Sequence, residues 1–325
     1  MISTFLKPIL LIVIFSFSSL LLANQFDNPY QGNVIATSAS ESELKEQALL
    51  QVLIKVSGNS GIGSLSETKS LLNKAQQFVS QYGYQTEQGE KYFSAVFDQN
   101  KINQSLRDMQ QPVWGDTRPT TLIWLINNNQ LVSEQDINSA GDTSLSLPLK
   151  QAQQARGIQV QFPLMDLDDN IALSVSDVRG RFYDQVANAT MRYARGHFVV
   201  AEFKAMAGDK WKLSWRLVQT DTVSKQHAIL KNEQFIDTKA QVITQMVDTL
   251  ADFYAGQYAI LENQNEKFMQ TVHINGIDSL QKLAKLNNVF ENLLAISSFS
   301  IVSAKADQVS VDVKLKGALQ ALKTP

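Results

Sequence analysis

The sequence predicts an α/β protein of the α+β class, in which several small mixed-sheet modules follow an N-terminal signal peptide. The first observation behind this prediction is that segments with apolar residues at helical spacing are interspersed with short strand-like segments. The second is that the chain has 325 residues, of which 44% are hydrophobic and 18% charged, as is typical of folded proteins with two or three domains. We expect modules at residues 24–112, 113–262 and 263–325, after a signal peptide at residues 1–23.

The N-terminal segment MISTFLKPILLIVIFSFSSLLLAN has one cation, Lys7, followed by an apolar run from Ile9 to Leu22 and the small residue Ala23. This run is shorter than the roughly 20 apolar residues that a membrane-spanning helix needs. The pattern is typical of a secretory signal peptide cleaved after Ala23, and it predicts a periplasmic protein. An uncleaved anchor in the inner membrane is the alternative. No later segment approaches membrane-spanning length, so no transmembrane helix is expected in the mature chain.

The first module, residues 24–112, is predicted to have β-α-α-β-α order. A strand begins at Val34, and the spacing of Ser40 and Glu43 is that of a capping box, which starts the first helix. A second helix is expected from near Ser64 to Gly83, because glycine commonly follows the last turn of a helix. Its apolar face would consist of Leu71, Ala75, Phe78 and Tyr82. The strand KYFSAVF and a short helix complete the module.

The second module, residues 113–262, begins with a continuously apolar segment from Thr121 to Ile126, which predicts a strand buried on both faces. A polar loop, a helix, a strand from Ile158 to Phe162, an aspartate-rich loop and another helix follow. A long helix from about residue 237 to residue 261 ends the module.

Between these helices, HFVVAEFKAM and KWKLSWRLV are expected to form a β-hairpin around Gly208 and Asp209. Four large apolar residues share one face of its second strand: Trp211, Leu213, Trp215 and Leu217. They could form a stacking platform for a glycan or a peptide. We interpret them instead as core residues under a helix, because large aromatic side chains contribute most to core burial.

The last module, residues 263–325, is predicted to be a β-α-β-β unit whose helix packs on one face of a sheet. FMQTVHING has the pattern of a strand, and the segment from Ser279 to Leu294 that of a helix. FSIVSAKA and QVSVDVKLKG then form a hairpin. The second of these strands alternates strictly between polar residues and the apolar residues Val309, Val311, Val313 and Leu315.

Four motifs together resemble an uncharacterised family of exported proteobacterial proteins, domain of unknown function family 2066. They are EQALLQVLIKVSGNSG, PVWGDTRPTTLIWL, ARGIQVQFPLMDLDD and SDVRGRFYDQVANATMRYARG. The resemblance extends from about Val34 to Leu217. The family pattern favours Trp at the position where this chain has Arg179. Any role of the family that depends on that aromatic side chain is therefore weakened here. The family has no assigned activity, so the resemblance implies export and a fold but no mechanism.

The stretch PLMDLDDNIALSVSD, from Pro163 to Asp177, is the most acidic candidate for a binding site. Counted from Asp166, it has Asp168 in the third place and Asp177 in the twelfth, nearly as in a calcium-binding loop. The sixth place holds Ile171, however, where such a loop needs glycine for its sharp turn. We therefore expect no metal site here.

The same stretch is predicted to be a solvated connection between a strand and a helix. We expect Asp168 and Asp169 to be exposed, so that replacing either one with Asn changes stability little. Ser176 or Asp177 would cap the next helix. The alternative is a hydrolase in which Asp166, Asp168 or Asp177 acts with a carboxylate elsewhere in the chain.

Trp114 and Arg118, which flank Gly115 in PVWGDTRP, are interpreted as a stack at a domain junction; the other possibility is the edge of a ligand site. The glycine-rich SGNSGIG follows a helix rather than a strand, so it fits a helix C-terminus better than a phosphate-binding loop. The three histidines lack the spacing of metal ligands. No cofactor is expected.

These patterns together favour a non-enzymatic accessory or binding protein of the periplasm or cell envelope. The formal net charge is −2 with dispersed Lys and Arg, so nucleic acid is not an expected partner. The chain has no cysteine, which excludes disulfides, lipid attachment through a thioether and cysteine nucleophiles. The expected partners are envelope proteins or cell-wall components. The candidate binding residues are Trp114, Arg118, Asp166, Asp168 and Asp177.

Overall fold

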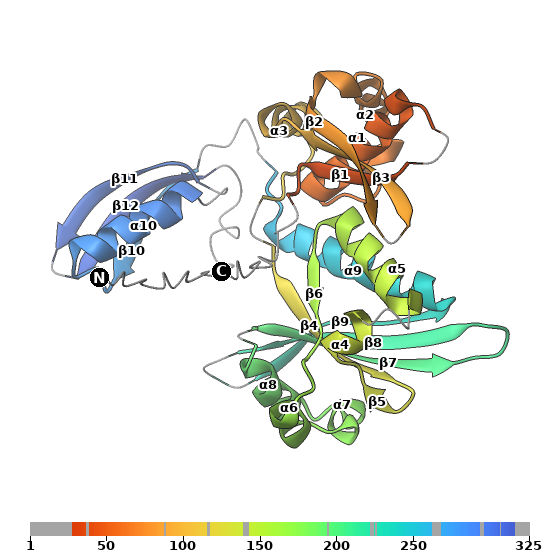
Figure 1. Ribbon diagram of the computed structural model, residues 1–325. Coiled ribbons are helices and arrows are strands. Elements are labelled where there is room, and N and C mark those ends of the chain that lie inside the picture. The colour runs from red at the N-terminus through yellow and green to blue at the C-terminus, as the bar shows by residue number, and fades with distance from the viewer. Residues whose placement is uncertain are drawn as a thin grey trace, which may run out of the picture.

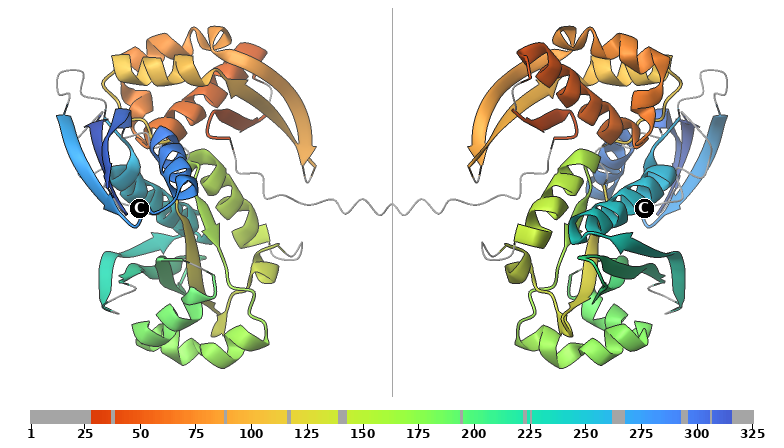
Figure 2. Two further views of the ribbon diagram at one scale, coloured as in Figure 1. Left: turned by 90° about the vertical axis from the view of Figure 1, so that its left-hand side faces the viewer. Right: turned by 90° about the vertical axis from the view of Figure 1, so that its right-hand side faces the viewer.

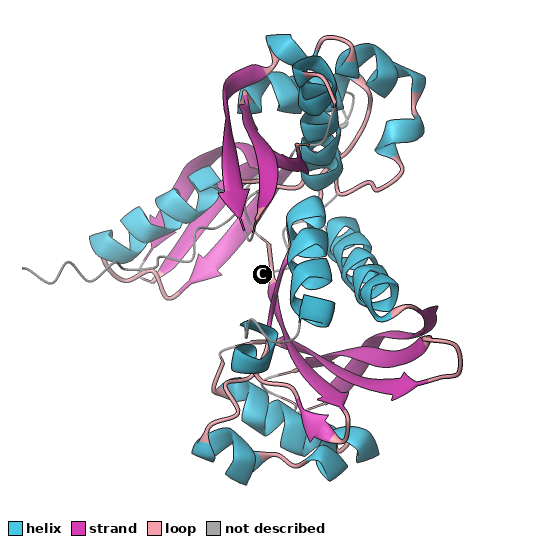
Figure 3. Ribbon diagram, turned by 45° about the vertical axis from the view of Figure 1, so that its right-hand side comes forward, coloured by secondary structure: helices cyan, strands magenta, loops and turns pink. Residues whose placement is uncertain are grey.

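The computed structural model describes residues 28–36, 39–87, 89–115, 118–138, 143–193, 195–221, 224, 226–261, 268–292, 296–305 and 307–315. These residues form helices with one mixed and two antiparallel sheets, which confirms the α+β class (Figures 1 and 3). The predicted signal peptide, residues 1–23, lies outside the described residues. Within the described part of the chain, no helix is both long enough and apolar enough to cross a membrane.

The first unit is an antiparallel sheet in the order β1-β3-β2, with helices gathered on one face (Figure 3). Its elements are β1 (Gln31–Ile35), α1 (Glu41–Ser57), α2 (Ser66–Leu72), β2 (Val79–Glu87), β3 (Glu90–Phe97) and α3 (Gln99–Asp108), with short 3-10 turns η1 (Ile62–Ser64) and η2 (Ala75–Gln77). The predicted capping box at Ser40 and Glu43 is present and starts α1. The buried face of α1 packs on β1 and β3, around the fully buried Phe93.

The prediction of one helix from Ser64 to Gly83 is wrong. The helix ends at Leu72, and the chain becomes the edge strand β2 from Val79 onward. The strand forms because it pairs antiparallel with β3, where Tyr82 and Tyr84 contact the ring of Phe93 at centroid distances of 5.7 and 5.4 Å. Gly83 lies inside this strand and terminates no helix.

The second unit is built on a mixed sheet in the order β5-β4-β7-β8-β9, with β6 also paired to β4. Its strands are β4 (Thr120–Asn127), β5 (Gln130–Leu131), β6 (Gln159–Gln161), β7 (His197–Ala205), β8 (Trp211–Thr220) and β9 (His227–Asp237). Its helices are α4 (Glu134–Asn138), α5 (Thr143–Arg156), α6 (Leu167–Ala172), α7 (Val175–Gly180), α8 (Tyr183–Met191) and α9 (Lys239–Tyr258). The predicted hairpin is present as β7 and β8, and β9 is a further strand that the sequence patterns did not indicate.

Helices cover both faces of this sheet, but unequally. Helices α5 and α9 lie on one face, and the short helices α6, α7 and α8 lie on the other, as Figure 1 and the side views of Figure 2 show. Leu213, Trp215 and Leu217 are buried beneath α9, in agreement with their interpretation as core residues. On the opposite face, β7 and β8 are apolar beneath the short helices but carry Glu202, Ser214 and Arg216 further along. The second helical layer therefore leaves part of the sheet polar and accessible.

The third unit is an antiparallel sheet in the order β10-β12-β11 with one helix, which matches the predicted β-α-β-β order. Its elements are β10 (Phe268–Asn275), α10 (Leu280–Asn292), β11 (Ile296–Lys305) and β12 (Gln308–Leu315). Phe290 of α10 packs with Val309, Val311 and Val313 of β12, so the alternating residues face the helix as expected.

The first and second units meet at the C-terminal end of α1. The last carbonyl groups of a helix have no partner within the helix, and they carry the negative end of its dipole. Arg118 Nη2 donates to the carbonyl of Lys55 at 2.8 Å, and the amide of Trp114 donates to the carbonyl of Val56 at 2.6 Å. The guanidinium of Arg118 also lies 4.2 Å from the Trp114 ring centroid and donates to the carbonyl of Gly157 at 2.8 Å. Trp114 and Arg118 therefore lie in a junction stack.

A second arginine, Arg156 at the end of α5, contacts the same helix end. Its Nη2 donates to the carbonyl of Gly58 at 3.2 Å, and its guanidinium is paired with Asp248 and Asp252 of α9 at 3.1 and 2.5 Å. Gly58 has a φ of 71°, and a Cβ atom there would lie 2.3 Å from the Cβ of Ala255. Glycine is therefore required at this position, both by its backbone conformation and by the close approach of α9.

Replacing Arg118 with Ala should lower the free energy of unfolding by about 2 to 4 kcal/mol, because two carbonyls at the junction lose a charged donor. Urea denaturation followed by tryptophan fluorescence measures this loss. The exposed Lys210 supplies a control, since Lys210→Ala should change stability by no more than about 0.5 kcal/mol. Equal stability of the two variants would contradict the assignment of Arg118 to the junction.

Candidate functional site

The aspartate-rich stretch begins with a helix cap. Asp166 is the N-cap of α6, and its side chain accepts from the amide of Asp169 at 3.2 Å. The guanidinium of Arg192 donates two hydrogen bonds to the same carboxylate, at 2.6 Å to Oδ1 and 2.5 Å to Oδ2. This pairing with Arg192, helped by the backbone amides, lowers the pKa of Asp166 from 3.8 to about 2. Asp166 is therefore a capping residue whose carboxylate already has a cationic partner.

Asp169 is the central residue of this stretch, and the expectation that it is exposed is wrong. Its side chain is 1% exposed. It accepts from the hydroxyl of Tyr193 at 2.5 Å, from the amide of Met165 at 2.9 Å and from Arg192 at 3.0 Å. Burial, followed by this bond to Asp169, raises the pKa of Tyr193 to about 12. This cluster could not be predicted from local sequence patterns, because Arg192 and Tyr193 lie more than 20 residues further along the chain.

Asp177 and Asp168 have different positions from Asp169. Asp177 lies in the first turn of α7 and forms a capping box with Ser174, which is the N-cap of that helix. The expectation that Ser176 or Asp177 would itself cap the next helix is wrong, because α7 begins earlier, after Ser174, and α8 begins only after Phe182. Its bonds to Ser174 also lower the pKa of Asp177. Asp168 is exposed in the first turn of α6, as predicted. Among the described residues, no group of three or more His, Asp or Glu side chains could hold a metal ion.

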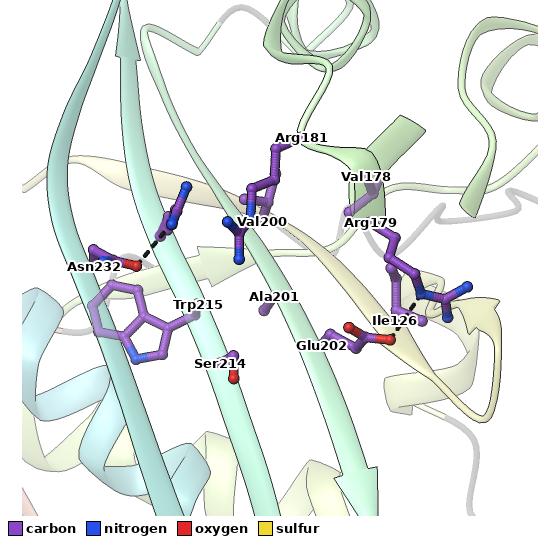
Figure 4. Close-up of a pocket in the computed structure, with 11 residues that line it drawn as sticks. Ile126, Val178, Arg179, Arg181, Val200, Ala201, Glu202, Ser214, Trp215 and Asn232 are labelled. Atoms are coloured by element: carbon purple, nitrogen blue, oxygen red, sulfur yellow. Dashed lines mark hydrogen bonds and ion pairs between the residues drawn. The ribbon is translucent and has the colours of Figure 1, made fainter. Parts of the chain in front are cut away.

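A small basic pocket lies where α7 meets the polar part of the sheet (Figure 4). Its volume is about 60 Å³, and it is lined by Val178, Arg179 and Arg181 at the end of α7 and by residues of β7, β8 and β9. This pocket could not be predicted from the sequence, because its lining residues come from segments that only the fold brings together.

Two of the three arginines in this pocket already have partners. Arg179 donates to Glu202 at 2.9 Å and to the side-chain oxygen of Asn129 at 2.9 Å. Arg216 donates to Asn232 at 2.8 Å and to the hydroxyl of Tyr183 at 3.2 Å. Because Glu202 is the one carboxylate among the lining residues, the pocket carries an excess of positive charge.

The third arginine, Arg181, has no such partner among the described residues. Its backbone has φ 62° and ψ 40°, the left-handed conformation of a helix C-cap, and its amide donates to the carbonyls of Asp177 and Val178 at the end of α7. Figure 4 shows its side chain directed from the end of α7 toward the sheet. Its side chain makes no hydrogen bond or ion pair among the residues that the structure describes. Five N–H donors are therefore available at the opening of the pocket.

Comparison with protein families gives one match, which covers the first unit. The family called Domain of unknown function (DUF8605) matches residues 23–115, less than half of the chain. The match supports a domain of unknown function, but it is not family 2066, which the sequence motifs resemble. No curated protein matches the chain. The second unit, with the basic pocket, lies beyond the matched residues.

Replacing the buried Asp169 with Asn should lower the free energy of unfolding by about 2 to 3 kcal/mol. The substitution removes a buried negative charge that accepts from Arg192, Tyr193 and a backbone amide. Asp168→Asn, one residue earlier on the exposed side of the same turn, should change it by no more than about 0.5 kcal/mol. Thermal and urea denaturation of both variants give the comparison. A similar small loss in both would show that Asp169 does not hold the segment together.

The ion pair of Asp166 and Arg192 should also contribute to acid stability. Because the folded-state pKa of Asp166 is about 2 and its ordinary pKa is 3.8, the stabilisation is fully present above 3.8 and is lost as the pH falls through 2. Asp166→Asn keeps an N-cap side chain but loses the charge. Its stability, measured by denaturation across this range, should fall less steeply with acid than that of the wild type. Parallel curves would contradict this role.

Proposed function

We propose that this chain is an exported accessory protein of the cell envelope that binds another protein through the basic pocket. The export part of the proposal depends on the sequence pattern of residues 1–23. The resemblance to the exported family 2066 also supports export in this proposal. It extends past residue 115, where the match to the other family ends. The observation that carries the binding part is the unpaired guanidinium of Arg181 at a concave, polar part of the sheet.

The small size of the pocket favours a group on a large partner over a free small molecule. Pockets for small ligands usually have volumes of about 300 to 1,000 Å³. A pocket of about 60 Å³ can accept a single side-chain head group. A protein partner would supply the rest of its contacts outside the pocket.

The charge and donor geometry of the pocket favour a carboxylate. A guanidinium presents parallel N–H donors that match the two oxygens of a carboxylate. The neighbouring side chains of Ser214 and Asn232 are neutral and polar, so they add no competing negative charge. We therefore propose that a Glu, Asp or C-terminal carboxylate of the partner docks against Arg181.

The alternative of a hydrolase that uses the carboxylates of residues 166–177 has less support. Asp166 is held by Arg192, and Asp177 is held in the cap of α7. Both carboxylates have lowered pKa values, whereas a general acid needs a raised one. Asp168 is exposed, and no carboxylate among the described residues is paired with it.

Titration of the purified mature protein with a glutamate-rich peptide tests the pocket. The peptide should perturb the NMR signals of residues around Arg181, and its binding should weaken as salt is added. Arg181→Gln should weaken binding by about tenfold, as expected for the loss of one charged hydrogen-bonded contact. Arg181→Lys should recover only part of the affinity, because it keeps the charge without the planar fork.

Lys210→Gln is a matched control, because it removes one exposed cation outside the pocket. The proposal predicts that this variant binds the peptide as the wild type does. Binding that is equal in Arg181→Gln and Lys210→Gln would overturn the assignment of the pocket. Tight binding of cell-wall fragments in place of the peptide would overturn the choice of a protein partner. Mass spectrometry of the protein from cells tests export, which requires a mature N-terminus near residue 24.

A further inference from the structure

A larger cavity lies at the other end of the layer formed by α6, α7 and α8. Its volume is about 360 Å³, which is within the range of small-ligand sites. Its lining includes the apolar residues Ala187, Met191 and Phe198 together with polar side chains, among them Arg195. Size and lining together indicate a site for a small molecule with an apolar body and a polar end.

Arg195 has an unused donor at this cavity. Its Nη2 donates to the side-chain oxygen of Gln161 at 3.2 Å, which is a neutral partner. Its Nε is buried and has no hydrogen-bond partner among the described residues, nor does the guanidinium pair with a described carboxylate. Its Nη1 likewise makes no hydrogen bond to a described residue, so the guanidinium of this lining residue keeps donors for a bound acceptor.

The remaining charged groups of the cavity are already paired with one another. His227 Nε2 lies 2.9 Å from Asp184 Oδ1, and its Nδ1 lies 3.0 Å from Thr220 Oγ1. The side chain of Asp184 is 80% exposed, unlike the buried carboxylate that orients histidine in a hydrolytic triad. These three residues therefore order one wall of the cavity, and Arg195 is the group left to bind a ligand.

We infer that this cavity binds a small monocarboxylate with an apolar chain. The carboxylate accepts from the guanidinium of Arg195, and the chain lies against Ala187, Met191 and Phe198. A carboxylate is favoured over a neutral acceptor because Arg195 lacks a negative partner. This site is separate from the basic pocket at Arg181, and the inference does not depend on the proposed function.

Calorimetric titration with sodium octanoate tests the inference, with acetate and 1-octanol as partial ligands. Acetate has the charge without the chain, and octanol has the chain without the charge. Octanoate should bind with a one-to-one stoichiometry, and each partial ligand should bind at least about tenfold more weakly, since each loses one set of contacts. Saturable octanoate binding should also raise the melting temperature.

Two variants separate the halves of the site. Arg195→Gln should weaken octanoate binding by about tenfold and leave octanol binding unchanged. Met191→Gln, at a side chain that is 57% exposed, should weaken octanoate and octanol alike. Arg181→Gln, in the other pocket, should bind octanoate as the wild type does.

Three results would overturn the inference: no octanoate binding by the wild type at millimolar concentration, equal affinity for octanoate and octanol, or unchanged binding in Arg195→Gln. Misfolding of the Arg195 variant would be detected by loss of its cooperative urea unfolding transition, a control that does not depend on the pocket at Arg181. In that event, chemical-shift mapping of octanoate binding to the wild type tests the location of the site. Perturbed signals that lie outside α8 and Phe198 would contradict it. Failure of the peptide experiment with success of this one would refute the proposed function alone.

Discussion

The structure depends on how the C-terminal end of α1 is satisfied. A buried helix end presents unpaired carbonyls and a partial negative charge, which are costly unless donors meet them. Here the donors come from the second unit: Arg118 reaches the carbonyl of Lys55, Arg156 that of Gly58, and the amide of Trp114 that of Val56. Arg156 is also paired with two aspartates of α9. The guanidinium that donates to the first unit is therefore oriented by side chains of the second unit. The two units are therefore joined by backbone acceptors and cationic donors as well as by apolar contact.

This junction lies on one side of the central sheet, and the two pockets lie on the other side. Helices α5 and α9 lie between the sheet and the first unit, and the buried hydroxyl of Tyr254 is bonded to Thr121 of β4 at 2.7 Å. The opposite layer consists of the short helices α6, α7 and α8. In it, Asp169 of α6 accepts hydrogen bonds from Arg192 and Tyr193, which follow α8. An arginine without a carboxylate partner follows each of two helices in this layer, Arg181 after α7 and Arg195 after α8. The aspartates that stand out in the sequence thus support the layer, and the two arginines are the groups for which we propose binding.

Local patterns predicted the parts of the fold that local physics determines. The capping box at Ser40, the hairpin at Gly208 and the alternation of Val309 to Val313 were all correct, because each feature is specified by neighbouring residues. The strand β2 was missed because its residues also fit a helical period, and pairing with β3 decided the outcome. The acceptors of Arg118 and Arg156 could not be predicted, because they are backbone carbonyls, which every residue has whatever its side chain. The two pockets could not be predicted either, because their walls combine helix ends with distant strands.

Native-state amide hydrogen exchange tests the junction most directly. The amide of Trp114 donates to the carbonyl of Val56 across the junction at 2.6 Å. Next to it, the side chain of Val113 packs in the core of the first unit, and the amides of Val113 and Ile260 each donate to the other's carbonyl at 2.9 and 3.0 Å. If the capped end of α1 joins the units into one cooperative structure, these amides exchange only through global unfolding. Their exchange free energies should then equal those of core amides in β4 and α1. Exchange of the three amides with a much lower free energy, while both cores stay protected, would show that the units separate without unfolding and would contradict the account.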